Sequence, residues 1–113
     1  MKIIKTMNAF ESYDVATIYE MTKGPNHDGI KDHDGERFHV IDFCHYVDEK
    51  DKELLTLMTE EGIIMTTNSK TAIADFFDVY DMYLDFGHSG GSYEIGIYSG
   101  TAKSGRTFYG IRI

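Results

Sequence analysis

The spacing of apolar and polar positions along the chain predicts two helices. The first follows Asp14, whose carboxylate can cap the free amide groups at the start of a short helix, and it ends in the Lys-Gly-Pro run 23–25. The second can be capped by Asn68 or Ser69, and the glycines of residues 87–91 are expected to end it. Its apolar residues recur three and four positions apart and are expected to face the core: Ile73, Phe76, Phe77, Tyr80, Tyr83 and Leu84.

Five further segments have the composition of strands, with many β-branched and aromatic residues. A charged turn joins the first two, and the run Glu60-Glu61-Gly62 joins the second to the third. Connections this short favour an antiparallel meander. The last two flank Lys103-Ser104-Gly105 as a hairpin. The predicted strands are 38–47, 54–58, 63–67, 93–99 and 107–113.

The order helix, three strands, helix, two strands predicts an α+β fold with an antiparallel five-stranded sheet. A chain of 113 residues has room for one domain with one core, so we expect a single domain over residues 1–113. Residues 26–36 contain only one apolar side chain, Ile30, and are expected to form a loop.

The single cysteine, Cys44, cannot form a disulfide within the chain, and no segment has the charged start, apolar middle and cleavage site of a signal peptide. We therefore expect a protein of the reducing cytoplasm. No apolar run approaches the roughly 18 residues that cross a bilayer, so no membrane partner is expected.

Acidic residues outnumber basic ones, 19 to 11, which gives a net charge of -8. The imbalance is uneven along the chain. Residues 86–113 hold three bases (Lys103, Arg106 and Arg112) and one acid (Glu94), so the excess of negative charge lies entirely in residues 1–85. A nucleic-acid binder usually has the opposite sign, and a strongly acidic surface favours a basic partner.

Four carboxylates form a row on the second predicted helix, because Asp75, Asp78, Asp81 and Asp85 lie three or four positions apart. One interpretation is an ordinary solvated face. The other is that this row, together with acidic residues of the two turns, presents negative charges in place of nucleic-acid phosphates and docks onto a basic groove. The turn residues in this candidate partner-binding set are Asp48, Glu49, Glu60 and Glu61.

Five histidine or cysteine side chains fall within residues 27–45, and zinc takes three or four such ligands. If a metal is bound, His27 and His33 from the loop and Cys44 from the strand are the preferred ligands. The alternative is surface histidines beside one buried thiol. Cys44 and His45 point to opposite faces of a strand, which argues against a catalytic Cys/His pair, and we expect no enzyme activity.

The closing hairpin, residues 98–109, sets aromatic residues beside basic ones, a combination that can stack bases and contact phosphates. An ordinary hairpin with core aromatics is the alternative. This stretch (Ser99 to Phe108) and residues 46–71 resemble small proteins encoded among phage and prophage genes of Gram-positive bacteria, some labelled as possible single-stranded DNA-binding proteins. The resemblance implies a DNA contact at Lys103, Arg106, Phe108 and Tyr109.

In size, charge and phage-like framework the chain is also similar to anti-CRISPR proteins, several of which occupy the DNA-binding surfaces of CRISPR nucleases. The leading hypothesis is therefore a phage-derived inhibitor that binds a type II CRISPR effector nuclease of the host bacterium through its acidic, DNA-mimicking surface. The alternative is a phage replication accessory protein that binds single-stranded DNA through the last hairpin. A metal-stabilised interaction module, with zinc holding the loop against the strand, is compatible with both.

Overall fold

A computed structural model describes residues 1–87 and 93–113. Both predicted helices are present, each with its predicted cap: Asp14 Oδ1 accepts a hydrogen bond from the amide of Thr17, and Ser69 Oγ accepts one from Ala72. Gly87 is the C-cap of the second helix, whereas the predicted role of Gly90 and Gly91 lies outside the described residues. The helices are α1 (Val15–Thr22) and α2 (Lys70–Phe86), with two short 3-10 turns, η1 (Phe10–Ser12) and η2 (Ile30–His33).

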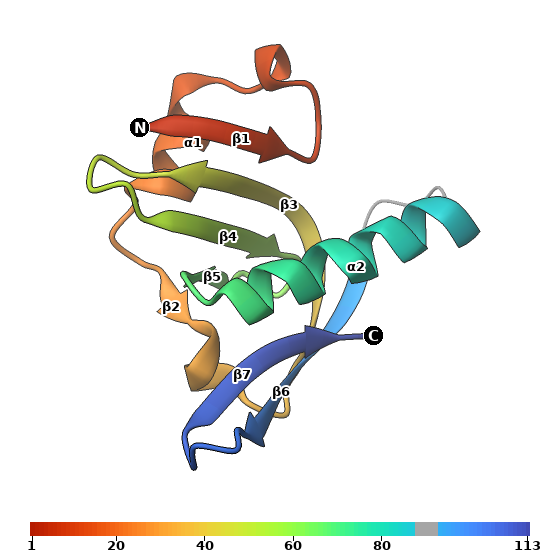
Figure 1. Ribbon diagram of the computed structural model, residues 1–113. Coiled ribbons are helices and arrows are strands. Elements are labelled where there is room, and N and C mark those ends of the chain that lie inside the picture. The colour runs from red at the N-terminus through yellow and green to blue at the C-terminus, as the bar shows by residue number, and fades with distance from the viewer. Residues whose placement is uncertain (88–92) are drawn as a thin grey trace.

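Within these residues, seven strands form one mixed sheet, in the order β2-β5-β4-β3-β6-β7, with β1 also paired to β3 (Figure 1). The prediction of an antiparallel five-stranded sheet is wrong, although helices and strands do combine as α+β. The strands are β1 (Lys2–Thr6), β2 (Asp28–Gly29), β3 (Arg37–Val47), β4 (Glu53–Thr59), β5 (Ile64–Thr67), β6 (Tyr93–Thr101) and β7 (Thr107–Arg112).

The two strands missed by the prediction carry little hydrophobic signal. In β1, only Ile3 and Thr6 are even half-buried, so the strand is held mainly by backbone pairing with β3. In β2, two residues without an apolar side chain pair with β5, and this pairing is parallel, with Asp28 opposite Met65. A pattern of side-chain hydropathy cannot reveal strands whose stabilisation comes from backbone hydrogen bonds.

Strand β3 organises the sheet. One edge pairs with β4, while the other edge pairs with β6 through residues 37–40 and with β1 through residues 44–47. The β3–β4 register shifts between Val40 and Asp42, which leaves Ile41 opposite no partner. Such an irregularity bends a strand and increases its twist, and β3 curls at this region so that the sheet forms a half-barrel (Figure 1).

The helices cover opposite faces of the sheet. Phe43 of β3 packs in the main core against Phe76 and Tyr80 of α2, with ring centroids 5.2 and 5.0 Å away. The next residue, Cys44, points the other way and joins Met21 of α1 in a smaller cluster. Cys44 and His45 thus lie on opposite faces, as their adjacency predicts. Neither helix in the described part of the chain combines the length and apolar character required to cross a membrane.

Candidate functional site

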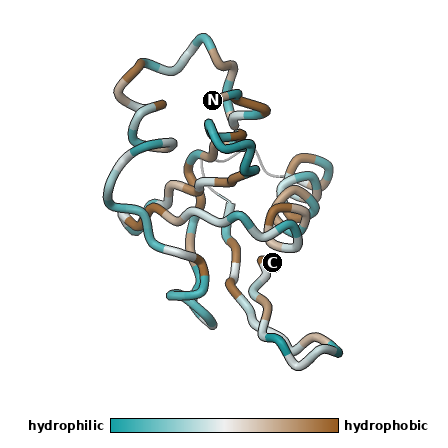
Figure 2. The backbone as a smooth tube through the Cα atoms, turned by 60° about the vertical axis from the view of Figure 1, so that its left-hand side comes forward, coloured by the Kyte–Doolittle hydropathy of each residue, from teal (hydrophilic) through white to brown (hydrophobic). Residues whose placement is uncertain are grey.

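An open groove of about 920 Å³ lies where three parts of the fold meet: the β2–η2 segment, the start of α2 and the tip of the β6–β7 hairpin. This hairpin stands away from the body of the protein (Figure 2). Ligand sites occupy roughly 300–1,000 Å³, so the groove has ample size. Its lining consists of Gly29, Ile30, Lys31, Lys52, Leu54, Thr66, Thr67, Asn68, Ser69, Ala102, Ser104, Arg106, Thr107, Phe108 and Tyr109.

Among the residues that the structure describes, every charged side chain in this lining is a cation. Lys31 comes from η2, Lys52 from the β3–β4 turn and Arg106 from the β6–β7 turn, and all three are exposed. Around them are the hydroxyl groups of five serine or threonine residues and the amide of Asn68. In a chain of net charge -8, this concentration of positive charge is a local reversal of sign that favours an anionic ligand.

The start of α2 forms part of the groove wall and adds to its positive character. Ser69 and Thr67 fix this junction, because Ser69 caps the helix and the hydroxyl of Thr67 accepts a hydrogen bond from the amide of Ser69. The free amide groups and the dipole at the start of a helix favour anions. The helix end therefore acts in the same direction as the three cations.

Two aromatic residues of β7 complete the groove. Phe108 is half-buried and lies across Gly100, where an added Cβ would come within 2.6 Å of the ring. Tyr109 is also half-buried and packs against the edge of the main core. Tyr109 thus contributes to the core and both residues line the groove, while a contact of this hairpin with nucleic acid stays a prediction. Lys103 lies in the exposed turn outside the lining.

Asp75 fixes the hairpin to α2. One oxygen of its carboxylate, Oδ2, accepts hydrogen bonds from the Tyr98 hydroxyl at 2.9 Å and from the amide of Ile111 at 3.1 Å. The hydrogen bond to the carboxylate raises the pKa of Tyr98. Gly110 makes this anchor possible, because a Cβ there would collide with both the Tyr98 ring and the Asp75 carboxylate. Asp75 is thus an internal anchor and not part of an exposed acidic row.

The opposite wall is held by His33. Its Nε2 lies 2.8 Å from Asp28 Oδ2 and its Nδ1 contacts Glu36, so both ring nitrogens face carboxylates. The hydrogen bond to Asp28 is the largest cause of a raised pKa at His33, and the contact with Glu36 raises this pKa further. Partial burial acts in the opposite direction and lowers it. Ile30 is buried in the main core. Residues 26–36, predicted as a loop, are therefore an ordered wall that contains β2 and η2.

The predicted zinc ligands do not come together. Both ring nitrogens of His27 are engaged: Nε2 donates to the carbonyl of Glu20 at 2.6 Å and Nδ1 accepts from the Thr66 hydroxyl at 2.7 Å. His33 contacts Asp28 and Glu36, and Cys44 is fully buried in the cluster beneath α1, where burial raises the pKa of its thiol to about 11. In the described part of the chain, no group of three or more His, Cys, Asp or Glu side chains is arranged to hold a metal ion, so the zinc hypothesis gains no support.

Of the eight predicted partner-binding acids, four have internal partners. Besides Asp75, these are Asp48, which accepts hydrogen bonds from two amides of its own turn, Glu49, which pairs with Lys23 at 2.6 Å, and Glu61. The other four are exposed on the surface: Glu60, Asp78, Asp81 and Asp85. Glu49 and Glu61 are exposed as well, but within the described part of the chain the predicted acids that lack such a partner lie on one helix face and at one turn residue.

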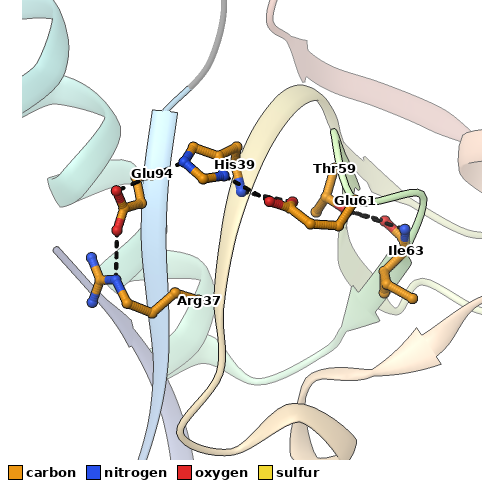
Figure 3. Close-up of polar contacts among 6 residues, drawn as sticks. All are labelled: Arg37, His39, Thr59, Glu61, Ile63 and Glu94. Carbon is orange, nitrogen blue, oxygen red and sulfur yellow. Dashed lines mark hydrogen bonds and ion pairs between the residues drawn. The ribbon is translucent and has the colours of Figure 1, made fainter.

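Glu61 belongs to a chain of ionic contacts that also includes His39, Glu94 and Arg37 (Figure 3). His39 Nδ1 lies 2.6 Å from Glu61, its Nε2 lies 3.8 Å from Glu94, and Glu94 accepts a hydrogen bond from Arg37 at 2.6 Å. The hydrogen bond to Glu61 raises the pKa of His39, and the same contact lowers that of Glu61. The contacts tie the β4–β5 turn to β3 and β6.

Two groove cations were missed by the analysis of the sequence. Lys31 lies in a segment predicted as a loop, and Lys52 lies in a turn counted among the acidic ones. Only Arg106 carried a signal, through the aromatic and basic pattern of the hairpin.

The chain matches no family model, and comparison with curated proteins and with solved structures gives no match.

Proposed function

We propose that the protein is a binding module that holds a single-stranded nucleic acid in the groove beside its last hairpin. The observation that carries this proposal is that Lys31, Lys52 and Arg106, drawn from three separate segments, are the only charged residues among the described ones that line the groove. Their convergence fits a ligand that bears several negative charges in a row, such as a phosphate backbone.

The aromatic residues support the same ligand. Proteins that bind single strands combine a positive groove with aromatic side chains on which bases stack. Phe108 and Tyr109 stand in the lining beside Arg106. Duplex DNA, by contrast, keeps its bases stacked inside and would bring a long line of phosphates against a protein of net charge -8. Both features favour a flexible strand over a rigid duplex.

The test is fluorescence anisotropy with a labelled oligothymidylate at low salt. Lys52→Gln and Arg106→Gln should each weaken binding by roughly tenfold or less and reduce the slope of log K against log salt by about 1 per lost phosphate contact. Lys50→Gln is the matched control, because Lys50 lies in the same turn as Lys52, is exposed, and does not line the groove. Absence of binding at low salt, or equal loss in the control, would contradict the proposal.

A second candidate function rests on a different observation, the exposed carboxylates of Asp78, Asp81 and Asp85 on one face of α2. We propose, as this second candidate, that the row mimics phosphates and blocks a type II CRISPR effector nuclease. A cleavage assay with purified nuclease and guide separates the candidates: cutting that persists at saturating protein across several such nucleases eliminates this one and leaves the groove proposal untouched.

A further inference from the structure

At the C-terminal end of α2, four apolar or aromatic side chains surround a shallow surface pocket of about 210 Å³: Met82, Tyr83, Phe86 and Ile113. Phe86 is 76% exposed, and Met82 and Ile113 are each about half exposed. Single exposed apolar residues are common on proteins, but a cluster of large ones around a hollow marks an interaction surface.

The pocket lies where α2 extends beyond the end of β7 (Figure 1). Asp75 anchors the helix at β7, and the helix then continues past the end of that strand (Figure 1). Met82 and Phe86 are four positions apart and therefore lie one above the other on the same flank of the helix. Met82 is 49% exposed and Phe86 76% exposed on this last part of the flank.

Beside this apolar row runs the acidic row Asp78, Asp81 and Asp85. Asp78 and Met82 are neighbours four positions apart, so the two rows are adjacent along the helix. Carboxylates at this spacing repel one another, and near the C-terminal end of a helix they also oppose its dipole. The last turn contains no basic residue that would offset them. Stability of the helix therefore does not explain why these acids are present.

The charges determine which occupant fits the pocket. A second copy of the chain docking by two-fold symmetry would bring the same acidic rows close to each other. A segment of another protein with apolar side chains on one face and Lys or Arg beside them would fill the pocket and neutralise the row.

We propose that this surface, the pocket of Met82, Tyr83, Phe86 and Ile113 with its acidic flank, docks a basic amphipathic segment of a partner protein. This surface lies at the opposite end of α2 from the groove, and docking there does not depend on nucleic-acid binding in the groove. It adds an apolar anchor to the charge row invoked for nuclease inhibition, and it requires no nuclease.

The experiment uses a fluorescein-labelled peptide of leucine and lysine arranged at helical spacing, with a scrambled peptide of the same composition as control, and measures anisotropy with the whole protein. The amphipathic peptide should bind about tenfold more tightly than the scrambled one. Phe86→Ser should remove that preference. Because Phe86 is mostly exposed, this variant should keep its melting temperature, which shows that the loss is not caused by unfolding.

Charge is tested by two matched pairs. Asp81→Asn with Asp85→Asn should weaken the amphipathic peptide severalfold while the melting temperature stays equal or rises, because like charges are removed from the helix. Glu11→Gln with Asp51→Asn removes the same charge from exposed sites elsewhere and should have a smaller effect. Equal affinity for both peptides, equal loss in the two pairs, or self-association abolished by Phe86→Ser would overturn the proposal.

Discussion

The two ends of α2 present opposite chemistry. At its start, Lys31, Lys52 and Arg106 gather around a groove, whereas near its end Asp78, Asp81 and Asp85 flank an apolar pocket. The net charge of -8 describes neither surface. Electrostatic attraction of a partner depends on the local arrangement of charges, so bulk acidity is a poor guide to what a protein of this kind binds.

Internal pairing explains much of the difference. Glu49 and Glu94 are paired with Lys23 and Arg37, and Asp75 is engaged by the hairpin. These acids contribute to the total charge while they serve structural contacts. The groove cations and the outer acids of α2 are exposed charges that gather at the two ends of one helix, and their placement gives these two surfaces opposite sign.

The largest expected effect comes from removing the Asp75 anchor between α2 and the last hairpin. Asp75→Ala removes the acceptor for the Tyr98 hydroxyl and for the amide of Ile111. Leaving such partly buried donors without a partner costs about 1–3 kcal/mol, so the free energy of unfolding should fall by that amount in urea denaturation. Asp78→Ala is the control, because Asp78 is exposed and its loss should leave the unfolding curve nearly unchanged.

Gly110→Ala should disrupt the same Asp75 anchor from the hairpin side. The new methyl group would meet the Tyr98 ring and the Asp75 carboxylate, and overpacking of this kind costs typically 1–3 kcal/mol. Oligonucleotide binding should weaken along with stability, while the peptide-binding surface at the other end of α2 should be less affected. Wild-type stability in this variant would show that the anchor can rearrange.

Reversing one groove cation should sharpen the contrast in charge. Lys52→Glu places a carboxylate in a lining that otherwise carries only cations, whereas Lys50→Glu makes the same change two residues away and outside the groove. We expect anisotropy titrations to show about tenfold or greater loss of oligonucleotide affinity for the first variant, with a clearly smaller loss for the second. Similar losses would mean that net charge, and not the groove, governs binding.

A smaller effect should follow from pH. Contacts with Asp28 and Glu36 raise the pKa of His33 in the folded protein, so protonated His33 stabilises the fold. This contribution is fully present below the unfolded value near 6.5 and is lost as the pH rises through the higher folded value. Urea denaturation across this window should therefore show falling stability. His33→Gln should flatten the dependence, and an unchanged slope would show that the groove wall does not rely on His33.

The sequence by itself determined the helices with their caps, the long strand β3, the short β4–β5 connection and the closing hairpin. The helix caps are set by contacts among residues a few positions apart, such as Asp14 with Thr17 or Ser69 with Ala72. The strands and turns are marked by their local hydropathy and turn residues. The hairpin pattern also indicated Arg106 and the two aromatic residues beside it.

Only the tertiary structure decided the rest. Strands β1 and β2 pair through their backbones with segments distant in sequence, and the curl of β3 brings η2, the β3–β4 turn and the last hairpin around one groove. Side-chain patterns carry no record of such pairings, because backbone hydrogen bonds are available to almost any residue. The same holds for the acids: which carboxylates face solvent and which are engaged internally depends on contacts between distant residues, as Asp75 and Asp78 show on a single helix.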